Sequence, residues 1–314
     1  MKVRTSLGAA AVRVPGSTSN LGSGFDCVGL AIDHFLDVAF QPGAGGFTVE
    51  RTDEARPGEA LGEDLIATAF HRGLRAKGLE ARGVVRVNSS IPVARGLGSS
   101  GAALVAGAAL AALVAGERID PAAAFAFATR EEGHGDNAGA SSYGGLVAAV
   151  GGIHALRAIS LELSPAVGFA FAAPATRVPT RAARAALPAS VPHAVAVGAV
   201  ARAAALLRGL ATGDADLLRC GFEDALHVPY RLPLIGGAEG ALAAALEAGA
   251  WAGTVSGSGS GLLAVCPPED AARIAESMAR ALAERHDPDG IISFPLRPVP
   301  LGVRELKIAP VTAE

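Results

Sequence analysis

Residues 91–103, with the sequence IPVARGLGSSGAA, join a glycine-rich turn directly to a long apolar helix. Gly96, Gly98 and Gly101 carry no Cβ, so successive backbone N–H groups can curl around phosphate oxygens. The helix that follows adds the positive end of its dipole. A Walker A loop is excluded, because the chain contains no Gly-Lys-Ser or Gly-Lys-Thr and only three lysines. The stretch predicts a phosphate site held mainly by backbone groups, and a Gly/Ser helix entry without a ligand is the alternative.

The composition gives room for two domains and provides no surface for nucleic acid. The 314 residues, 50% of them hydrophobic, suffice for two domains of about 150 residues each. A net charge of −3 and scattered arginines form no basic field, so nucleic acid is not an expected partner. Cys27, Cys220 and Cys266 lie far apart without C-x-x-C spacing. This indicates a reducing cytoplasm rather than a disulfide framework or a zinc site.

Neither a secretory signal nor a membrane segment is expected. Lys2 and Arg4 add charge to the start of the chain, but no apolar segment follows them. Residues 96–116 contain no charge and approach the length of a membrane helix. They begin with the glycine-serine loop and continue mostly as alanine, so we interpret them as a helix buried between a sheet and other helices.

The periodicity of apolar residues predicts an α+β protein with helices layered on antiparallel sheets. Strands are expected at 9–15, 35–40, 47–51, 84–88, 146–150, 167–172, 254–255, 262–265, 291–296 and 303–308. Helices are expected at 63–77, 99–115, from Asp120-Pro121 onward, and at 180–187, 191–210, 215–221, 238–248 and 269–285. The pattern restarts after Gly151-Gly152, which predicts two domains at 1–160 and 161–314.

A polar loop ends in a carboxylate near the N-terminus. The stretch 14–26, VPGSTSNLGSGFD, reads as a strand that stops at Pro15 and enters this loop. Asn20 and Asp26 are its candidate functional residues. Plain turn chemistry is the alternative, because Ser, Thr, Asn, Asp and Gly are the residues that turns use.

A second polar cluster, REEGHGDN at 130–137, follows the predicted third helix. Glu132 can offer a hard oxygen ligand to Mg²⁺, and Ser100 is the natural second ligand. A site made of histidines is disfavoured, because His134 has no histidine neighbour in the sequence and Mg²⁺ prefers oxygen. A charged helix end followed by a solvated turn is the alternative.

Two arginines are candidates for binding a carboxylate. The first lies in TRAARAALP at 180–188, where a four-residue gap places Thr180 and Arg184 on one helix face. The second, Arg231, ends DALHVPYR at 224–231. A guanidinium fork makes bidentate, charge-assisted hydrogen bonds that lysine cannot reproduce. For either arginine alone, an ordinary surface position is the alternative.

These stretches resemble motifs of the GHMP kinases. The phosphate-loop stretch resembles Pro-x-x-x-Gly-Leu-Gly-Ser-Ser of that family, and VSGSGSG at 255–261 resembles its third motif. The loop at 15–26, the cluster at 132–137 and the two arginine elements resemble signatures of its homoserine kinase branch. The chain departs from those patterns at five positions, namely Gly16, Ser23, Gly135, Ser258 and Ser260.

The resemblance implies a two-domain fold, with an N-terminal domain like ribosomal protein S5 and a ferredoxin-like C-terminal domain. It implies ATP bound by Pro92, Val93, Ala94, Arg95, Gly96, Leu97, Gly98, Ser99, Ser100, Gly101, Ala102, Ser256 and Gly257. With Mg²⁺ at Ser100 and Glu132, the amino-acid pocket would comprise Asn20, Asp26, His134, Asn137, Thr180, Arg184 and Arg231. Of these, the catalytic candidates are Asn20, Asp26, Asn137 and Arg184.

The activity that the resemblance implies is transfer of the γ-phosphoryl group of ATP to the side-chain hydroxyl of L-homoserine, for threonine biosynthesis. It also suggests a homodimer. Three alternatives belong to the same fold: a kinase for shikimate or a mevalonate-like acid, an ATP-dependent decarboxylase, and a catalytically silent amino-acid sensor. The loop at 20–26 argues against the decarboxylase, and the intact phosphate loop and Glu132 argue against the sensor.

Overall fold

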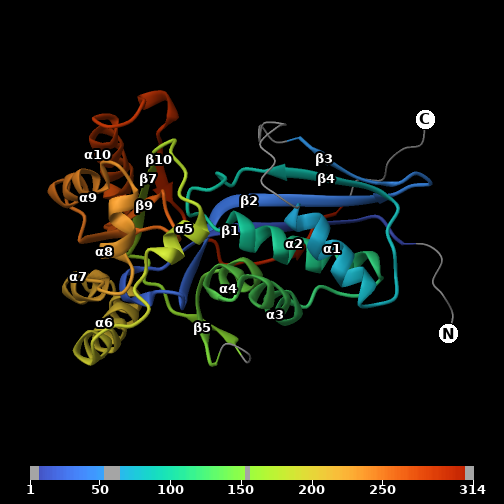
Figure 1. Cartoon of the computed structure of the whole chain (residues 1–314), viewed down its shortest axis with the longest axis horizontal. Coiled ribbons are helices and arrows are strands. Elements are labelled where there is room, and N and C mark those ends of the chain that lie inside the picture. The colour runs from blue at the N-terminus through green and yellow to red at the C-terminus, as the bar shows by residue number, and fades with distance from the viewer. Residues whose placement is uncertain (1–6, 53–63, 153–155, 308–314) are drawn as a thin grey trace.

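Two sheets with their helices lie side by side in the computed structural model, which describes residues 7–52, 64–152 and 156–307 (Figure 1). The first sheet has the strand order β11-β1-β2-β4-β3, with β5 paired to β2 and β6 paired to β5. Its strands are β1 (Ala10–Ser19), β2 (Val28–Pro42), β3 (Phe47–Arg51), β4 (Gly83–Ser89), β5 (Leu146–Val150), β6 (Arg157–Leu161) and β11 (Arg304–Glu305). All the pairings are antiparallel except that of β3 with β4.

Four helices accompany this sheet: α1 (Leu65–Arg75), α2 (Ser99–Val114), α3 (Pro121–Glu132) and α4 (Asp136–Tyr143). Ten of the sixteen residues of α2 are buried, which confirms that the uncharged stretch is an interior helix. At Gly107 a Cβ would lie 2.5 Å from the Ile66 carbonyl oxygen, so glycine lets α1 and α2 approach closely. The Asp120 side chain accepts from the Ala122 N–H, as expected for the N-cap of α3.

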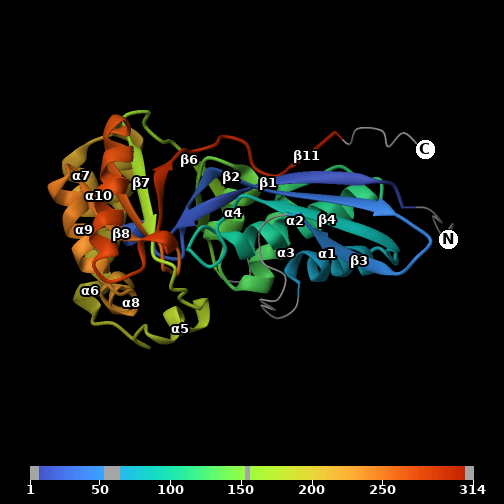
Figure 2. The same ribbon diagram turned by 90° about the horizontal axis from the view of Figure 1, so that it is seen from above.

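The second sheet is antiparallel, with the order β10-β7-β9-β8. Its strands are β7 (Gly168–Ala173), β8 (Ala252–Val255), β9 (Leu262–Cys266) and β10 (Ile292–Leu296). The helices of this half are α5 (Thr180–Ala185), α6 (His193–Thr212), α7 (Ala215–Phe222), α8 (Val228–Arg231), α9 (Ala238–Glu247) and α10 (Ala271–Ala283) (Figure 2). Four short 3-10 turns complete the fold: η1 (Gly22–Gly24), η2 (Leu232–Leu234), η3 (Pro268–Asp270) and η4 (Pro288–Gly290).

The prediction that the first strand stops at Pro15 is wrong. β1 continues to Ser19, and its register with β2 shifts between Pro15 and Gly16. A bulge at this point accommodates the missing N–H of proline. The same bend brings the Ser17 N–H to within 3.1 Å of the Leu97 carbonyl oxygen, so the strand supports the glycine-rich loop directly.

The last strand also differs from expectation. The sequence pattern grouped residues 303–308 with the strands of the second half, but β11 pairs with β1 in the first sheet, with Val12 opposite Glu305. Residue 308 lies outside the described part. The end of the chain therefore crosses back to the first half, and the division at 160 and 161 stays a prediction. The sequence pattern also missed β6, α4 and α8.

Within the described residues, one helix is long and apolar enough to cross a membrane by length and composition, and it is α6 rather than the stretch singled out from the sequence. Only 17% of the most apolar 18-residue segment of α6 is buried inside the fold.

Candidate active site

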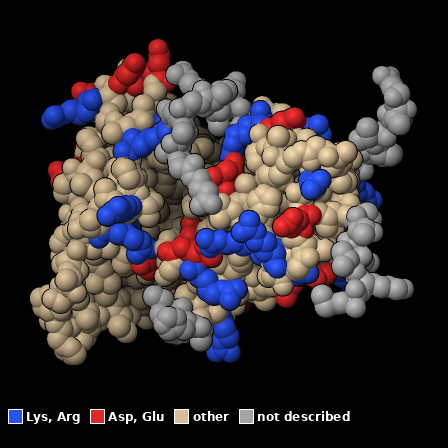
Figure 3. Space-filling model, turned by 45° about the vertical axis from the view of Figure 1, so that its right-hand side comes forward, with Lys and Arg blue, Asp and Glu red and all other residues tan. Residues whose placement is uncertain are grey.

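A cavity of about 830 Å³ lies between the two halves. It is lined by the start of α1, the glycine-rich loop, the loop after β1, the turn between α3 and α4, helix α5, and residues 231 and 257–258. Charged side chains gather where the two halves meet (Figure 3). Most of the residues singled out from the sequence therefore meet at one place, although their motifs are spread over more than 200 residues.

The glycine-rich loop has the backbone geometry of an anion site. Gly96 and Gly98 have φ angles of 73° and 69°, in the left-handed region that favours glycine. Gly98 is the N-cap of α2 and, within the described chain, no side chain caps this helix end. The first N–H groups of α2 thus remain available to a ligand in the cavity.

The third glycine motif packs directly on this loop. The Ser256 hydroxyl donates to the Gly96 carbonyl oxygen at 2.7 Å and shares a hydrogen bond with the Thr18 hydroxyl at 2.9 Å. The Gly257 N–H donates to the Ser19 carbonyl oxygen at 2.9 Å. A Cβ at Gly96 would lie 1.9 Å from the Ser256 carbonyl oxygen, which requires glycine there. These contacts fix the loop against the second half of the chain.

Asn20 organises the loop after β1. Its side-chain amide donates to the Gly257 carbonyl oxygen at 2.8 Å, and its side-chain oxygen accepts from the Asp26 N–H at 2.8 Å. Asn20 has a φ of 61°, an uncommon conformation that these two hydrogen bonds hold in place. Asn20 lines the cavity as expected, but both ends of its amide are engaged within the protein.

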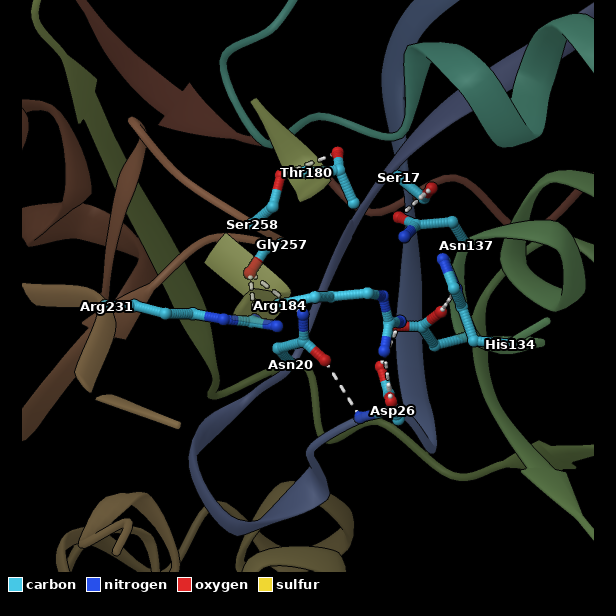
Figure 4. Close-up of polar contacts among 11 residues, drawn as sticks. Ser17, Asn20, Asp26, His134, Asn137, Thr180, Arg184, Arg231, Gly257 and Ser258 are labelled. Carbon is cyan, nitrogen blue, oxygen red and sulfur yellow. Dashed lines mark hydrogen bonds and ion pairs between the residues drawn. The ribbon is translucent and has the colours of Figure 1, made fainter. Parts of the chain in front are cut away.

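Asp26 and Arg184 form a bidentate ion pair across the cavity, with N–O distances of 2.9 and 3.0 Å (Figure 4). Although partial burial opposes its charge, hydrogen bonding and attraction to Asp26 raise the pKa of Arg184. The pair joins the two halves of the fold. The sequence singled out both residues but gave no signal that they bind each other.

Arg231 lies beside this pair and is almost completely enclosed, with 1% of its surface exposed. One N–H of its guanidinium group donates to the Gly257 carbonyl oxygen at 2.9 Å, and the group lies 4.9 Å above the Phe25 ring. Phe25 in turn stacks on buried His227 at 4.9 Å. Burial lowers the pKa of Arg231. The supporting roles of Phe25 and His227 were missed, although both residues stand inside the motifs quoted above.

Glu132 is buried at the end of α3, facing the start of α2. Burial raises the pKa of its carboxyl group, while the nearby His134 and the Ser100 hydroxyl favour the charged form. Oε2 has no hydrogen-bond partner within the described part of the chain. A buried, partly unsatisfied carboxylate beside a hydroxyl matches the oxygen ligands that Mg²⁺ prefers. Ser100 and Glu132 therefore fit the predicted ion.

His134 and Asp136 form a second charged pair, with Nδ1 and Oδ1 2.7 Å apart. Burial opposes both charges, yet the contact raises the pKa of His134 and lowers that of Asp136. Asp26, His134 and Asp136 each place a potential metal ligand within 4.8 Å of the others. Arg184 pairs with Asp26 and His134 pairs with Asp136, so each carboxylate of this cluster already has a partner. Asp136 was not among the predicted site residues.

The remaining candidates are also held by neighbours. The Asn137 side-chain oxygen accepts from the Ser17 hydroxyl at 2.9 Å, and the hydroxyls of Thr180 and Ser258 lie 3.3 Å apart. Ser17 was missed by the sequence reasoning. Four of the predicted ATP ligands are not among the described residues that line the cavity: Pro92, Arg95, Ala102 and Ser256.

Comparison with known proteins gives the family. The model of the N-terminal domain of GHMP kinases matches residues 64–145, and that of the C-terminal domain matches residues 203–284. A homoserine kinase of Thermus thermophilus is 40% identical over 285 residues, which cover 88% of this chain and 92% of that protein. A homoserine kinase of Synechococcus strain CC9605 is 38% identical over 276 residues, covering 86% and 88%. The chain belongs to the homoserine kinases of the GHMP kinase family.

Solved structures agree with the two-domain GHMP kinase fold. A homoserine kinase from Cytophaga hutchinsonii superposes with a TM-score of 0.82 at 25% identity, over 98% of this chain and all of that one. The L. major mevalonate kinase in complex with R-mevalonate reaches 0.70 at 15% identity over 95% and 98%, which shows the shared fold alone. The α+β, two-domain prediction is confirmed.

Proposed function

We propose that this homoserine kinase family member transfers the γ-phosphoryl group of ATP to the side-chain hydroxyl of L-homoserine, giving O-phospho-L-homoserine for threonine biosynthesis in the cytoplasm. One observation supports the proposal most directly. The glycine-rich loop before α2, in which Gly96 and Gly98 have left-handed backbone conformations, lines the same cavity as Arg184 and Arg231. Such a cavity suits a polyphosphate at one end and a carboxylate at the other. The homoserine kinase relatives favour homoserine over shikimate or a mevalonate-like acid.

The triphosphate would lie against the N–H groups of residues 96–101, where Gly96, Gly98 and Gly101 have no side chain to keep a ligand from the backbone. Ser256 supports this loop through its hydrogen bond to the Gly96 carbonyl oxygen, whereas Gly257 lines the cavity. Ser100 and Glu132 would hold Mg²⁺, which neutralises phosphate charge when it is bound.

The amino acid would lie between the two arginines and the α3–α4 turn. Arg184 and Arg231 offer guanidinium N–H groups to the α-carboxylate, and His134, Asn137 and Thr180 complete the pocket. Both arginines are held in place, one by Asp26 and the other by Gly257 and Phe25. Prepositioned groups lose little conformational freedom when the substrate binds.

Phosphoryl transfer of this kind depends mainly on alignment and charge stabilisation. The transition state is loose, so little proton removal is needed before the hydroxyl attacks. Both oxygens of Asp26 accept hydrogen bonds from Arg184, so this carboxylate is already engaged with the arginine. We infer that Asp26 orients the hydroxyl and the arginine rather than acting as an essential base.

Replacing Asp26 with asparagine is expected to lower kcat/KM for homoserine by about 10-fold, below the roughly 10² to 10⁴ of general-base loss. Asparagine keeps the size of the side chain and can still accept one hydrogen bond from Arg184. Steady-state kinetics with a coupled ADP assay measure the change. Asp37→Asn is the matched control, because Asp37 makes the same bidentate pair with Arg13 outside the cavity. A loss in kcat far above 10²-fold, with homoserine still bound, contradicts the positioning role.

The activity itself is tested with purified protein, ATP, Mg²⁺ and L-homoserine. The expected product is O-phospho-L-homoserine, identified by its mass, with one ADP released for each molecule formed. Shikimate and mevalonate in place of homoserine test the related kinases, and CO₂ release tests the decarboxylase. Phosphorylation of another alcohol with no product from homoserine overturns the proposal.

A further inference from the structure

Arg181 is a charged side chain of the cavity to which the proposed function gives no role. It lines the cavity from the first turn of α5, directly after Thr180 and three residues before Arg184. Its side chain is exposed, and within the described chain no hydrogen bond or ion pair holds the guanidinium group. Exposed arginines are ordinary on a protein surface, but this one borders the space that the proposed function gives to a triphosphate.

The other arginines that line the cavity already have partners. Arg51 pairs with Asp64 at 2.9 Å, and Arg184 pairs with Asp26 at 2.9 Å. Arg231 is enclosed and donates to a backbone carbonyl oxygen. No lysine is among the described residues that line the cavity. The arginine of the first turn of α5 can therefore take up the charge of a ligand without losing an existing contact.

The geometry of α5 directs Arg181 into the cavity. Successive residues of an α-helix are turned by about 100°, so Thr180, Arg181 and Arg184 share one side of α5. All three line the cavity, whereas exposed Ala182 on the other side does not. Because each residue advances the helix by about 1.5 Å, Arg181 lies about 4.5 Å nearer the start of α5 than Arg184 does.

The start of α5 lies at the phosphate end of the cavity. The hydroxyls of Thr180 and Ser258 are 3.3 Å apart (Figure 4). Gly257, the residue before Ser258, packs so closely on the glycine-rich loop that a Cβ there would lie 2.9 Å from the Gly96 carbonyl oxygen. One turn of α5 thus separates an arginine near the glycine-rich loop from Arg184, which reaches the amino-acid end.

We propose that the guanidinium group of Arg181 binds the γ-phosphoryl group of ATP and stabilises its charge during transfer, which makes Arg181 a catalytic residue. The inference rests on the proposed function, because it places a triphosphate against residues 96–101. In that reaction the bond from the γ-phosphorus to the bridging oxygen of ADP breaks. A bond to the homoserine hydroxyl oxygen forms, and the hydroxyl proton passes to water.

A guanidinium group matches the chemistry of the transferring group. The charge of this group is spread over three equatorial oxygens, and the guanidinium fork can donate to two of them at once. Since no contact within the described chain holds Arg181, its side chain loses rotational freedom when it binds phosphate, which offsets part of the gain. Its removal is therefore expected to weaken ATP binding modestly and to slow the transfer step much more.

Replacing Arg181 with methionine is expected to lower kcat about 100-fold, less than the loss of an enclosed catalytic arginine, because this side chain is exposed. The KM for homoserine should stay within about twofold, since Arg184 and Arg231 remain. Arg181→Lys keeps the charge without the planar fork and should lower kcat only about tenfold. The matched control is Arg208→Met, which removes an exposed arginine outside the cavity and should leave both constants unchanged.

Calorimetry with Mg²⁺ tests the contact without homoserine. The probes are ADP and AMP-PNP, an ATP analogue with nitrogen between its β- and γ-phosphorus atoms. Arg181→Met should bind AMP-PNP about fivefold more weakly than the parent does and bind ADP equally well, because only the analogue carries a γ-phosphoryl group. If the parent makes no O-phospho-L-homoserine but shows this difference, the proposed function fails and the contact of Arg181 stands.

Three results overturn the inference. The first is a kcat of Arg181→Met within twofold of the parent. The second is an equal loss of affinity for ADP and AMP-PNP, which would place the side chain on another part of the nucleotide. The third is a raised KM for homoserine with unchanged kcat, which would assign Arg181 to the amino-acid pocket.

Discussion

Replacing Glu132 with glutamine is expected to lower kcat about 10³-fold, while the KM for homoserine changes little. Glu132 is the buried carboxylate that faces Ser100 across the start of α2, and its Oε2 has no hydrogen-bond partner in the described chain. Glutamine has the same shape but brings no negative charge to Mg²⁺. Loss of metal-assisted charge stabilisation is worth several kcal/mol, and about 4 kcal/mol corresponds to 10³ in rate.

The stability of the same variant distinguishes a functional role from a structural one. Burial raises the pKa of Glu132, so the folded protein holds this proton more tightly than the unfolded chain does. The parent therefore loses stability relative to the glutamine variant as the pH rises above the ordinary range of a glutamate. Urea unfolding in metal-free buffer at neutral pH should show the variant to be at least as stable as the parent.

Glu131→Gln is the matched control. Glu131 is the preceding residue of the same helix, and its carboxylate pairs with Arg72 at the surface. We expect its kcat to stay within about twofold of the parent, since surface ion pairs contribute little. Equal losses for the two variants, or a Glu132→Gln enzyme whose rate still depends on Mg²⁺ like that of the parent, would contradict the assignment of Glu132 to the metal.

The glycine-rich loop and most elements could be predicted because their signals are local. Gly96 and Gly98 take left-handed conformations at the turn where the sequence predicts them. The uncharged composition of the residues that follow predicts a buried helix, as observed for α2. Periodicity reports one element at a time. It therefore predicted most of the helices and strands near their observed bounds. It underestimated β2, expected at 35–40 and observed over Val28–Pro42, missed β6, α4 and α8, and gave no information about which sheet the final strand joins.

The interactions that the sequence could not show are those between distant residues. Asp26 and Arg184 are 158 residues apart, and no local pattern indicates that each binds the other. Asp136 was missed for a different reason: its partner His134 is only two residues away, but a carboxylate in a polar turn is expected to be exposed to solvent, and only the fold buries it. Pro15 misled for a related reason, since the bulge that tolerates it is created by pairing with β2.

Replacing Arg231 with lysine is expected to raise the KM for homoserine about 50-fold, with the KM for ATP nearly unchanged and kcat within a few-fold. Charge-assisted hydrogen bonds contribute roughly 1.5 to 3 kcal/mol each, and a 50-fold change lies within this range. The enclosed guanidinium group already donates to Gly257 and lies 4.9 Å above the Phe25 ring, which leaves its other N–H groups for a carboxylate. A lysine ammonium keeps the charge but cannot make both contacts in one plane.

Arg304→Lys provides the control, because Arg304 lies over the Phe35 ring at 5.3 Å outside the cavity, and its replacement should leave both constants unchanged. The two KM values then separate the possible roles of Arg231. A rise confined to homoserine means that the fork binds the carboxylate. Gly257 also packs against Gly96 of the glycine-rich loop. An equal rise in both KM values would therefore mean that Arg231 acts by holding the turn at Gly257 in place. Arg184 alone would then bind the carboxylate.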